Sequence, residues 1–567
     1  MRRKTAFSGF FMGGIVMIIT KDAGKEYPET ASLASVMQEL QPDYPAKIVA
    51  AKLNGIVAGL QMPVGKYQSI EPIGMDSDTG RRIYRRSVIF LLVMAVFEVE
   101  PEAEVIVRFS ASNGIYCEIQ RTRERVVDEA FVAAIAAHMR EIVAEDRPIL
   151  KKSFPREKAV QMFLAVNHPE KARLISALEQ EMVSIYYCAK YYDYLYGAML
   201  ATTGELGKFA LDSYGAGVLL RTPIGAKYDE VPPLKKQPKL AGIFTESKRW
   251  AEILSCDYVT DLNQYNRHGE IGDIIRISEA LHEKRIAEIA DHIVSHDNIR
   301  LVLIAGPSSS GKTSFAQRLR IQLCVNGVRP VSISLDDYFN NREKTPKNER
   351  GEYDFEALEA VDVRLFNEHL VRLLSGDSVV TPRYNFLTGK REWTSHQSIH
   401  VGAHQPIIVE GIHGLNERLT GAIPREMKYK IYVSALTQLN IDAHNRIPTT
   451  DARFLRRLVR DYRTRGASAL KTFRQWPDVR AGEEKNIFPY QEEADAMFNS
   501  ALIYELGMLK KHAVPLLENI SPDVPEYARA MRMLDFCKYF DDIEAEEDVP
   551  NNSILREFIG KSCFFKE

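Results

Sequence analysis

A glycine-rich stretch followed by lysine and threonine is the clearest chemical signal in the sequence. Gly306-Pro-Ser-Ser-Ser-Gly311-Lys312-Thr313 fits the pattern G-x-x-x-x-G-K-[ST], in which backbone N–H groups cradle phosphates. The two glycines let the backbone wrap a phosphate without a Cβ in the way. Lys312 adds a full charge near the β- and γ-phosphates, and the Thr313 hydroxyl can hold Mg²⁺. We therefore expect phosphate binding by Gly306, Pro307, Ser308, Ser309, Ser310, Gly311, Lys312, Thr313 and Ser314.

The flanks of this loop predict the elements that would position it. Residues 301–305 are a short apolar run typical of a buried parallel strand, and Phe315, Ala316, Leu319 and Leu323 recur on one helical face. From residue 299 onward, strand-like runs alternate with helical patterns, which indicates a parallel sheet covered by helices. The other runs are 330–335, 406–409, 429–433 and 514–517. An amphipathic pattern predicts a helix over residues 277–296.

Polar, aromatic and basic clusters follow the loop along the chain. Asp336 and Asp337 end the second predicted strand, where ligands bind in open α/β sheets. The later clusters are Tyr353-Asp354-Phe355-Glu356, Arg383-Tyr384-Asn385-Phe386, Val409-Glu410-Gly411, and a helix carrying Arg453, Arg456, Arg457, Arg460, Arg463 and Arg465. Guanidinium forks suit phosphate oxygens. An arginine-rich helix is equally typical of an RNA-binding surface or of a solvated face.

In this order, the clusters resemble the uridine kinase and phosphoribulokinase family over residues 299–520. The resemblance implies a kinase that uses ATP or GTP, with Mg²⁺ held by Thr313 and Glu410. The alternative role for Glu410 is a surface ion pair without Mg²⁺. The implied catalytic residues are Asp336, Lys312, Arg457 and Arg460, with Asp336 as the proton acceptor and Asp337 as its alternative. The implied substrate contacts are Asp354, Glu356, Tyr384, Phe386 and Arg465.

Several of these implied roles stay open. Asp354 and Glu356 both lie near the position that binds ribose hydroxyls, and the two aromatic residues line either a base pocket or the core. Two departures concern the base: Phe339 and Gly389 stand where uridine kinases have a tyrosine and a histidine. Ala467 replaces a further lid arginine. The sequence thus predicts complete phosphate machinery with an unusual base reader.

The N-terminal part carries a second resemblance. Residues 51–60 resemble the TGS domain of threonyl-tRNA synthetases, and residues 84–223 resemble the editing-type domain that follows it. The family's metal-ligand and hydrolytic positions correspond here to Arg86, Phe90, Leu195 and Met199. None of these can act as the expected zinc ligand. We therefore expect the fold to be kept and the editing chemistry to be lost, with RNA contact as a further expectation.

These observations predict the fold class and the domains. We expect an α/β P-loop kinase with a parallel sheet covered by helices, preceded by small α+β TGS-like and editing-like domains. The expected boundaries are 1–16 for an N-terminal extension, 17–77 for the TGS-like domain, 78–223 for the editing-like domain, 224–274 for a linker region and 275–567 for the kinase domain. Residues 7–20 superficially resemble a signal peptide, but they lack a small-residue cleavage site and are too short to span a bilayer.

Composition narrows the setting of the chain. Of the 567 residues, 45% are hydrophobic and 26% charged, and the net charge of -2 gives no global attraction to nucleic acid or membrane. The six cysteines form no C-x-x-C pair, which favours a reducing, cytoplasmic location. His396, His400 and His404 would share a helix face, but Gly402 and its apolar neighbours favour a loop and strand over a metal site there.

We therefore expect a cytoplasmic kinase that transfers a γ-phosphoryl group to a small hydroxyl substrate, in first place the 5′-hydroxyl of a nucleoside. A kinase of another small polyol or sugar phosphate is the alternative within the same class. The alternative from a different class is an RNA- or nucleotide-binding regulator that uses the P-loop domain as a switch. No membrane partner is expected, and a homo-oligomer is left open.

Overall fold

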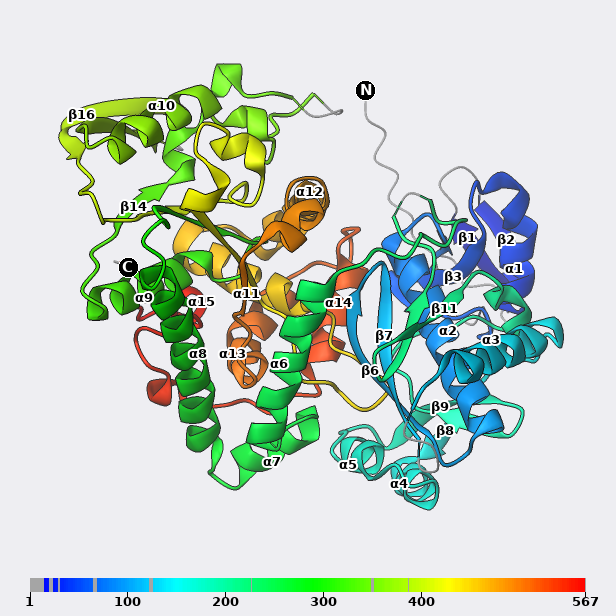
Figure 1. The fold of residues 1–567 in the computed structure, drawn as a ribbon. Coiled ribbons are helices and arrows are strands. Elements are labelled where there is room, and N and C mark those ends of the chain that lie inside the picture. Colours follow the sequence, from blue (N-terminus) through cyan, green and yellow to red (C-terminus); the bar gives the residue numbers. More distant parts are fainter. Residues whose placement is uncertain are drawn as a thin grey trace, which may run out of the picture. The chain divides into compact units, whose positions relative to one another are not determined.

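The structure is a computed structural model that describes residues 15–19, 24–28, 31–64, 69–121, 126–225, 227–347, 351–385 and 387–565. The chain divides into two compact units (Figure 1). The first contains the described part of Met1–Lys236 together with the later segments Asp442–Arg446 and Ser521–Arg532. The second contains Gln237–Ile441, Ile447–Ile520 and the described part of Met533–Glu567.

A five-stranded sheet forms the centre of the second unit. Its strand order is β14 (Val331–Ser334), β17 (Ile407–Glu410), β13 (Leu301–Ala305), β18 (Lys428–Ser434) and β19 (Ala496–Asn499). All neighbouring strands are parallel. Every residue of β13 is buried, as the apolar run predicted. This confirms the predicted α/β class with a parallel sheet.

Helices cover both faces of this sheet (Figure 1). Leu301 and Leu303 of β13 share a hydrophobic cluster with Phe366 and Leu370 of α10 (Val363–Leu374). Alternate strand residues point to the opposite face, where α9 (Lys312–Val325) packs against β13 and β17 and against α8 (Ile271–Val294). The packing of α9 on the sheet therefore fixes the start of this helix, and with it the glycine loop that precedes it.

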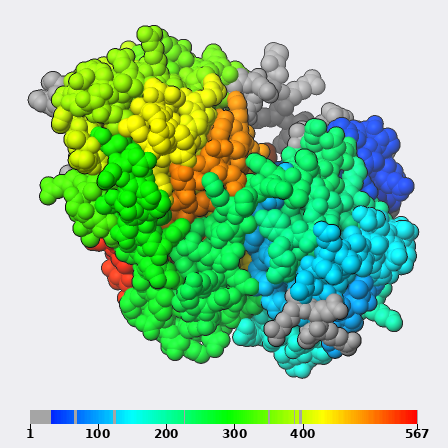
Figure 2. Space-filling model, viewed as in Figure 1, coloured from blue at the N-terminus to red at the C-terminus, as the bar shows by residue number. Residues whose placement is uncertain are grey.

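In Figure 2, yellow-green, yellow and orange parts of the chain lie next to one another on the visible face. The remaining elements of the second unit surround this core. They are α6 (Pro238–Leu254), α7 (Val259–Arg267), the hairpin of β15 (Val379–Asn385) and β16 (Lys390–Ile399), α11 (Thr449–Arg465), α12 (Ala469–Asn486), α13 (Glu505–Glu518) and α15 (Arg556–Ile559). Short 3-10 helices include η3 (Leu335–Tyr338), η8 (Phe488–Glu493) and η9 (Glu546–Asp548). Helix α14 (Tyr527–Cys537) begins in the first unit's last segment.

Three expectations of local structure differ from what is observed. Residues 514–517 were expected to form a strand, but they lie in α13, where Leu509, Ala513 and Leu517 are buried at a helical spacing of four. Residues 224–274 were expected to be a linker region, yet α6 and α7 occupy residues 238–254 and 259–267. The helix expected over 277–296 starts six residues earlier, as α8 at Ile271.

The first unit is built from small antiparallel sheets and helices. Its sheets are β1–β2 (Ile15–Ile19, Gly24–Pro28); β4–β3–β5 (Ile56–Ala58, Ile48–Leu53, Ile70–Gly74); β11–β12–β7–β6 (Ala210–Tyr214, Gly217–Arg221, Gly114–Gln120, Glu104–Ala111); and β10–β9–β8 (Tyr191–Asp193, Met182–Cys188, Leu150–Pro155). Its helices are α1 (Leu33–Leu40), α2 (Asp78–Val99), α3 (Glu129–Ala144), α4 (Arg156–Ala165) and α5 (Pro169–Ser176).

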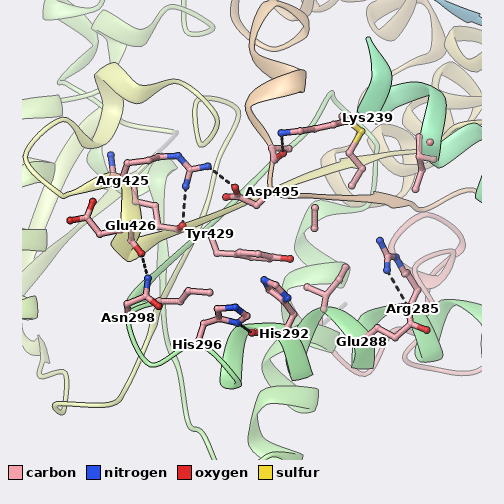
Figure 3. Close-up of a pocket in the computed structure, with 18 of the residues that line it drawn as sticks. Lys239, Arg285, Glu288, His292, His296, Asn298, Arg425, Glu426, Tyr429 and Asp495 are labelled. Atoms are coloured by element: carbon pink, nitrogen blue, oxygen red, sulfur yellow. Dashed lines mark hydrogen bonds and ion pairs between the residues drawn. The ribbon is translucent and has the colours of Figure 1, made fainter.

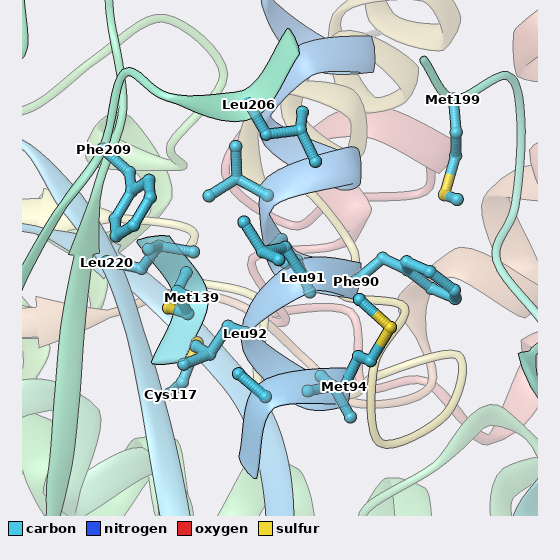
Figure 4. Close-up of a cluster of buried hydrophobic side chains, with 14 of the residues drawn as sticks. Phe90, Leu91, Leu92, Met94, Cys117, Met139, Met199, Leu206, Phe209 and Leu220 are labelled. Carbon is cyan, nitrogen blue, oxygen red and sulfur yellow. The ribbon is translucent and has the colours of Figure 1, made fainter. Parts of the chain in front are cut away.

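Helix α2 passes through the hydrophobic core of this unit (Figure 4). Phe90 and Met199 are fully buried there, and Leu195 is buried with them. Arg86, one turn before Phe90, donates to the carbonyl oxygen of Ala198 at 2.6 Å. The four positions at which the resemblance expects hydrolytic and metal-binding groups therefore come together in an apolar setting. Within the described residues, no group of three or more His, Cys, Asp and Glu side chains could hold a metal ion.

A cluster of buried charges holds the segment Asp442–Arg446 in the first unit. The Lys171 ammonium lies 2.5 Å from Asp193 Oδ1 and 3.3 Å from Asp442 Oδ1. The second oxygen of Asp193 lies 2.6 Å from His444 Nδ1. All four side chains are almost completely buried. Lys171 lowers the pKa of the Asp193 carboxyl against the opposing effect of burial, so this carboxyl is ionised.

In the described part of the chain, we find no helix that is both long and apolar enough for a membrane crossing.

Candidate active site

The glycine loop lies where β13 ends and α9 begins. A Cβ at Gly306 would stand 1.9 Å from the carbonyl oxygen of Val433, so only glycine fits there. Gly311 has φ +80°, and a Cβ on it would stand 2.4 Å from Ile554 Cγ2. Because this φ is in the left-handed region, glycine is required at the position for two independent reasons. The backbone between them is thereby set to present its N–H groups, with those of the first turn of α9, to an anion.

Lys312 and Thr313 start α9 and reach into the loop. The Lys312 ammonium donates to the carbonyl oxygens of Gly306 and Pro307 at 2.9 and 3.3 Å. The Thr313 hydroxyl donates to Glu410 Oε1 at 2.9 Å. Thr313 and Glu410 are 97 positions apart in the sequence, and the fold places them in direct contact. A hydroxyl beside a carboxylate is an oxygen ligand set of the kind that Mg²⁺ prefers.

Two neighbouring strands, β17 and β14, deliver the acidic residues of the site. Glu410 is the last residue of β17 and pairs with Ile304 of β13 on one side and with Ser334 of β14 on the other. Asp336 follows β14 by two residues, in η3. The carboxyl ends of parallel strands meet at one edge, which is the ligand edge of open α/β sheets. The pKa of Glu410 is raised to about 7, chiefly by burial and also by the nearby Asp336, against the opposing charge of Lys312.

The two adjacent aspartates have different surroundings. Asp337 Oδ1 accepts a hydrogen bond from the Tyr384 N–H at 3.3 Å and so holds the hairpin strand β15. Asp336 is exposed to solvent. The protein around Asp336 still raises its pKa by partial desolvation, and the positive charge of Lys312 acts in the opposite direction. Of the two carboxylates, Asp336 is therefore the one whose pKa is affected by Lys312, the lysine predicted to bind phosphate.

The expected substrate residues lie in different environments. Glu356 lies close to α12, because a Cβ added at Gly482 would stand 2.8 Å from the Cβ of Glu356. Burial and the neighbouring Glu483 raise the pKa of Glu356 to about 7, whereas Lys312 and Arg457 lower it. Asp354 instead accepts the Glu356 N–H at 3.1 Å within its own loop.

The aromatic positions lie mainly in the core. Tyr384 is buried in the same cluster as Phe339, with ring centroids 5.6 Å apart. Phe386 lies outside the described residues. Gly389 has φ +69°, and a Cβ there would stand 2.7 Å from Arg342 Nε. The guanidinium of Arg342 thus lies beside the position where the resemblance expects a histidine.

The arginine helix α11 lies along the glycine loop. Arg457 Nη1 donates to the Ser308 hydroxyl at 2.8 Å, and Arg460 Nη1 lies 3.4 Å from Glu557 Oε1. Arg465 is largely exposed and pairs with Asp461 at 3.1 Å. Its positive charge lowers the pKa of Asp336, so it too faces the site. Of the predicted lid arginines, Arg457 therefore contacts the loop itself, whereas Arg460 and Arg465 are paired with carboxylates beside it.

The structure also shows loop contacts that sequence reasoning missed. Arg453 donates to the Ser308 carbonyl oxygen at 3.0 Å and forms an almost completely buried ion pair with Glu483. Glu483 Oε1 in turn accepts the Ser308 N–H at 2.9 Å. Arg456 is paired with Glu505 in the same buried layer. Nothing in the sequence indicated these partners, because their spacing along the chain follows no motif.

Two other features lie apart from this site. The histidines His396, His400 and His404 are not brought onto one helix face, because His396 is in strand β16 and the others follow its end. A hollow of about 1020 Å³ opens at the amino ends of the strands, near Tyr429, opposite the phosphate loop (Figure 3). Its charges pair within the protein, as Arg425 does with Asp495 and Arg285 with Glu288. We assign it no ligand.

Comparison with known proteins identifies the two parts of the chain separately. Residues 301–503 match the Phosphoribulokinase / Uridine kinase family. The match begins at β13 and takes in the glycine loop, Asp336, Glu410 and α11, and it supports a P-loop kinase. A possible uridine kinase from Bacillus stearothermophilus is 16% identical over 38% of this chain and 98% of that chain, with a TM-score of 0.27.

The N-terminal half is similar to threonine–tRNA ligases. The chain is 28% identical over 190 residues to the enzyme of Bacillus velezensis, which is 33% of this chain and 29% of that protein. It is 26% identical over 281 residues to the enzyme of Symbiobacterium thermophilum, which is 49% of this chain and 40% of that protein. The chain thus spans less than half the length of these curated relatives. The predicted resemblances to the uridine kinase and phosphoribulokinase family and to threonine–tRNA ligases are confirmed. The TGS-like and editing-like assignments, the domain boundaries and the individual site roles stay predictions.

Proposed function

We propose that this protein is a kinase that transfers the γ-phosphoryl group of ATP or GTP to a small hydroxyl substrate, in first place the 5′-hydroxyl of a nucleoside. One observation carries the proposal. The glycine loop with Lys312, the Thr313–Glu410 contact and Asp336 all lie at the carboxyl ends of the neighbouring strands β13, β17 and β14. This grouping supplies a phosphate cradle, a metal position and a proton acceptor at one edge.

Each group has a defined part in the transfer. Lys312 and the loop N–H groups would bind the donor phosphates, and Arg457 and Arg460 would neutralise charge on the transferring group. Mg²⁺, held by Thr313 and Glu410, would supply further charge neutralisation on the phosphate oxygens. As the substrate hydroxyl oxygen bonds to the γ-phosphorus, the bond to the nucleoside diphosphate breaks and the hydroxyl proton passes to Asp336.

The preference for a nucleoside is supported by Glu356. A carboxylate can accept hydrogen bonds from the two neighbouring hydroxyls of a ribose ring. The charges that shift the pKa of Glu356 are those of Lys312, Arg457, Asp336 and Glu483, so Glu356 lies among the phosphate-transfer groups. Asp354 is occupied by a backbone contact in its own loop. We therefore assign the ribose contact to Glu356.

Two alternatives have their own support. Gly389 and Phe339 lack the polar groups expected of a base reader, which favours another small polyol or a sugar phosphate as the acceptor. Similarity of the N-terminal half to threonine–tRNA ligases favours an RNA-binding regulator with a nucleotide switch. A cytoplasmic location belongs to each of these proposals and is supported by the absence of disulfides among the six cysteines, all of which are free.

Turnover with a panel of acceptors tests the proposal. We expect the full-length protein with MgATP or MgGTP to phosphorylate more than one of uridine, cytidine, adenosine, guanosine and inosine. Base preference should stay within roughly 10- to 200-fold in kcat/KM, the range that a pocket without polar readers gives. Ribose and myo-inositol are the controls. Activity on the controls alone would remove the nucleoside assignment, and nucleotide binding without turnover on any acceptor would favour the regulator.

A further inference from the structure

The chain's C-terminal part lies on the phosphate loop in the second unit. Ile554 fills the space beside Gly311, where a Cβ would be 2.4 Å from its Cγ2 atom. Phe558 lies beneath two arginines of α11, with the guanidinium carbons of Arg456 and Arg460 at 5.0 and 5.9 Å from its ring centre. We name residues 550–560 the C-terminal strap. It lies beyond residue 503, where the family match ends.

Glu557 of the strap contacts the start of α9. Its Oε2 atom accepts hydrogen bonds from the Ser314 hydroxyl at 2.8 Å and from the Ser314 N–H at 3.4 Å. Its Oε1 atom lies 3.4 Å from Arg460 Nη1. The Glu557 side chain is only 11% exposed, so the carboxylate is held within the site and not on its rim.

This carboxylate uses groups that a nucleotide phosphate would need. N–H groups in the first turn of the helix after a glycine loop are the donors to nucleotide phosphates, and the positive end of the helix favours one anion there. A second anion on the same N–H would meet like-charge repulsion at short range. Arg460, a predicted phosphate contact, is also paired with Glu557. The Glu557 carboxylate therefore places a negative charge where we expect a nucleotide phosphate.

We propose that the C-terminal strap is an autoinhibitory element whose Glu557 carboxylate occupies a nucleotide phosphate position and must leave when the nucleotide binds. The inference rests on the proposed function in so far as the glycine loop must bind a nucleotide. Other contacts anchor the strap without Glu557. Ser553 donates to Glu279, and Arg556 donates to the Val549 carbonyl oxygen at 2.8 Å. Replacing Glu557 should consequently free the phosphate position and leave the segment folded.

Calorimetric titration of the full-length protein with MgADP tests the strap. If only a fraction of the protein molecules have the phosphate position free, the affinity for the nucleotide is reduced by that fraction. We expect Glu557→Gln and Glu557→Ala to lower the Kd for MgADP by about fivefold or more. Glu547→Gln is the matched control, because Glu547 is an exposed carboxylate nearby that pairs with Lys561. Its Kd should equal that of the wild type.

Hydrogen exchange on the wild-type protein gives a second readout that needs no variant. If the Glu557 carboxylate leaves Ser314 when MgADP binds, the strap loses this contact and amide exchange over residues 550–560 rises. Slower exchange there, or weaker MgADP binding by both Glu557 variants, would show that the strap is part of the donor site and would overturn the proposal. Equal Kd values for wild type and variants would overturn it as well. If neither wild type nor variants bind MgADP, the proposed function fails too.

Discussion

Asp336 and Asp337 share one chemistry and differ in their neighbours. Because Asp337 is bonded to the backbone of β15 and Asp336 is coupled to Lys312, the proton acceptor should be Asp336. We expect Asp336→Asn to lower kcat by about 10²-fold or more, with the Kd for the nucleotide little changed, because the amide keeps the size but cannot take the proton.

The neighbouring Asp337→Asn variant is the matched control for this prediction. It should keep most of the turnover, since its amide oxygen can still accept the Tyr384 N–H. Steady-state kinetics and nucleotide titration of both variants separate the two residues. Near wild-type turnover in Asp336→Asn would transfer the role to Asp337.

Glu356 should make stability depend on pH. The pKa of Glu356 is about 7 in the folded protein and 4.5 in an unfolded chain. Between pH 4.5 and 7, the folded state therefore binds more protons than the unfolded chain. The stabilising effect of its proton is complete below pH 4.5 and is lost as the pH rises through about 7. Glu356→Gln should therefore gain stability relative to wild type as the pH is raised from about 5 to 8.

Thermal unfolding of both proteins across this range, without nucleotide, measures the difference. A difference in melting temperature that stays constant, or that falls with rising pH, would contradict the raised pKa of Glu356.

At the scale of elements, sequence patterns predicted those parts of the site whose residues are contiguous in the chain. The strand, loop and helix from residue 301 to 325 form one continuous signal, because the apolar run, the glycines and the helical face follow one another directly. The strand β19 was missed, since Ala-Met-Phe-Asn is too short to show a period. Residues 514–517 were misread because Pro515 and its apolar neighbours look like a strand end.

Contacts between distant elements could not be predicted in the same way. Glu483 and Glu557 reach the glycine loop from α12 and from the strap, 175 and 243 positions away from their partners. A charged residue that is buried by a distant element has no signature in its own neighbourhood of the sequence. The motif residues of the site were thus predictable, and the carboxylates that hold or block the loop were not.

The buried charges around α5 and β10 should be essential to the first unit. Lys171 is completely buried with Asp193 and Asp442, so its removal leaves two carboxylates without their cation. Breaking a buried pair from one side typically costs about 3–5 kcal/mol. We expect Lys171→Met to lower the free energy of unfolding by that amount in calorimetry of the full chain, with Lys190→Met, an exposed lysine nearby, close to wild type. Equal transitions for the two variants would contradict the cluster.

At the scale of the whole molecule, the chain combines a kinase-family region with a half that is similar to threonine–tRNA ligases, and the chemistry of that second half can be tested separately. Phe90, Leu195 and Met199 are packed into the core, and Arg86 is engaged by a backbone carbonyl. None of these groups is a zinc ligand, because zinc in proteins takes Cys, His or carboxylate donors. We therefore expect the full-length protein to contain no stoichiometric zinc and to leave mischarged tRNA intact.

Elemental analysis and a deacylation assay on the purified full chain measure the two outcomes. One control is a variant that restores histidine at both α2 positions, Arg86→His with Phe90→His. This variant should still fail to hydrolyse mischarged tRNA, because Leu195 and Met199 remain apolar.

If the wild-type protein holds one zinc per chain, the ligands must come from outside the positions that the resemblance assigns. Deacylation without zinc would instead show that a catalytic group outside these four positions is open to substrate. The packing of Phe90, Leu195 and Met199 into the core, with no zinc donor among them, is the reason to expect neither outcome.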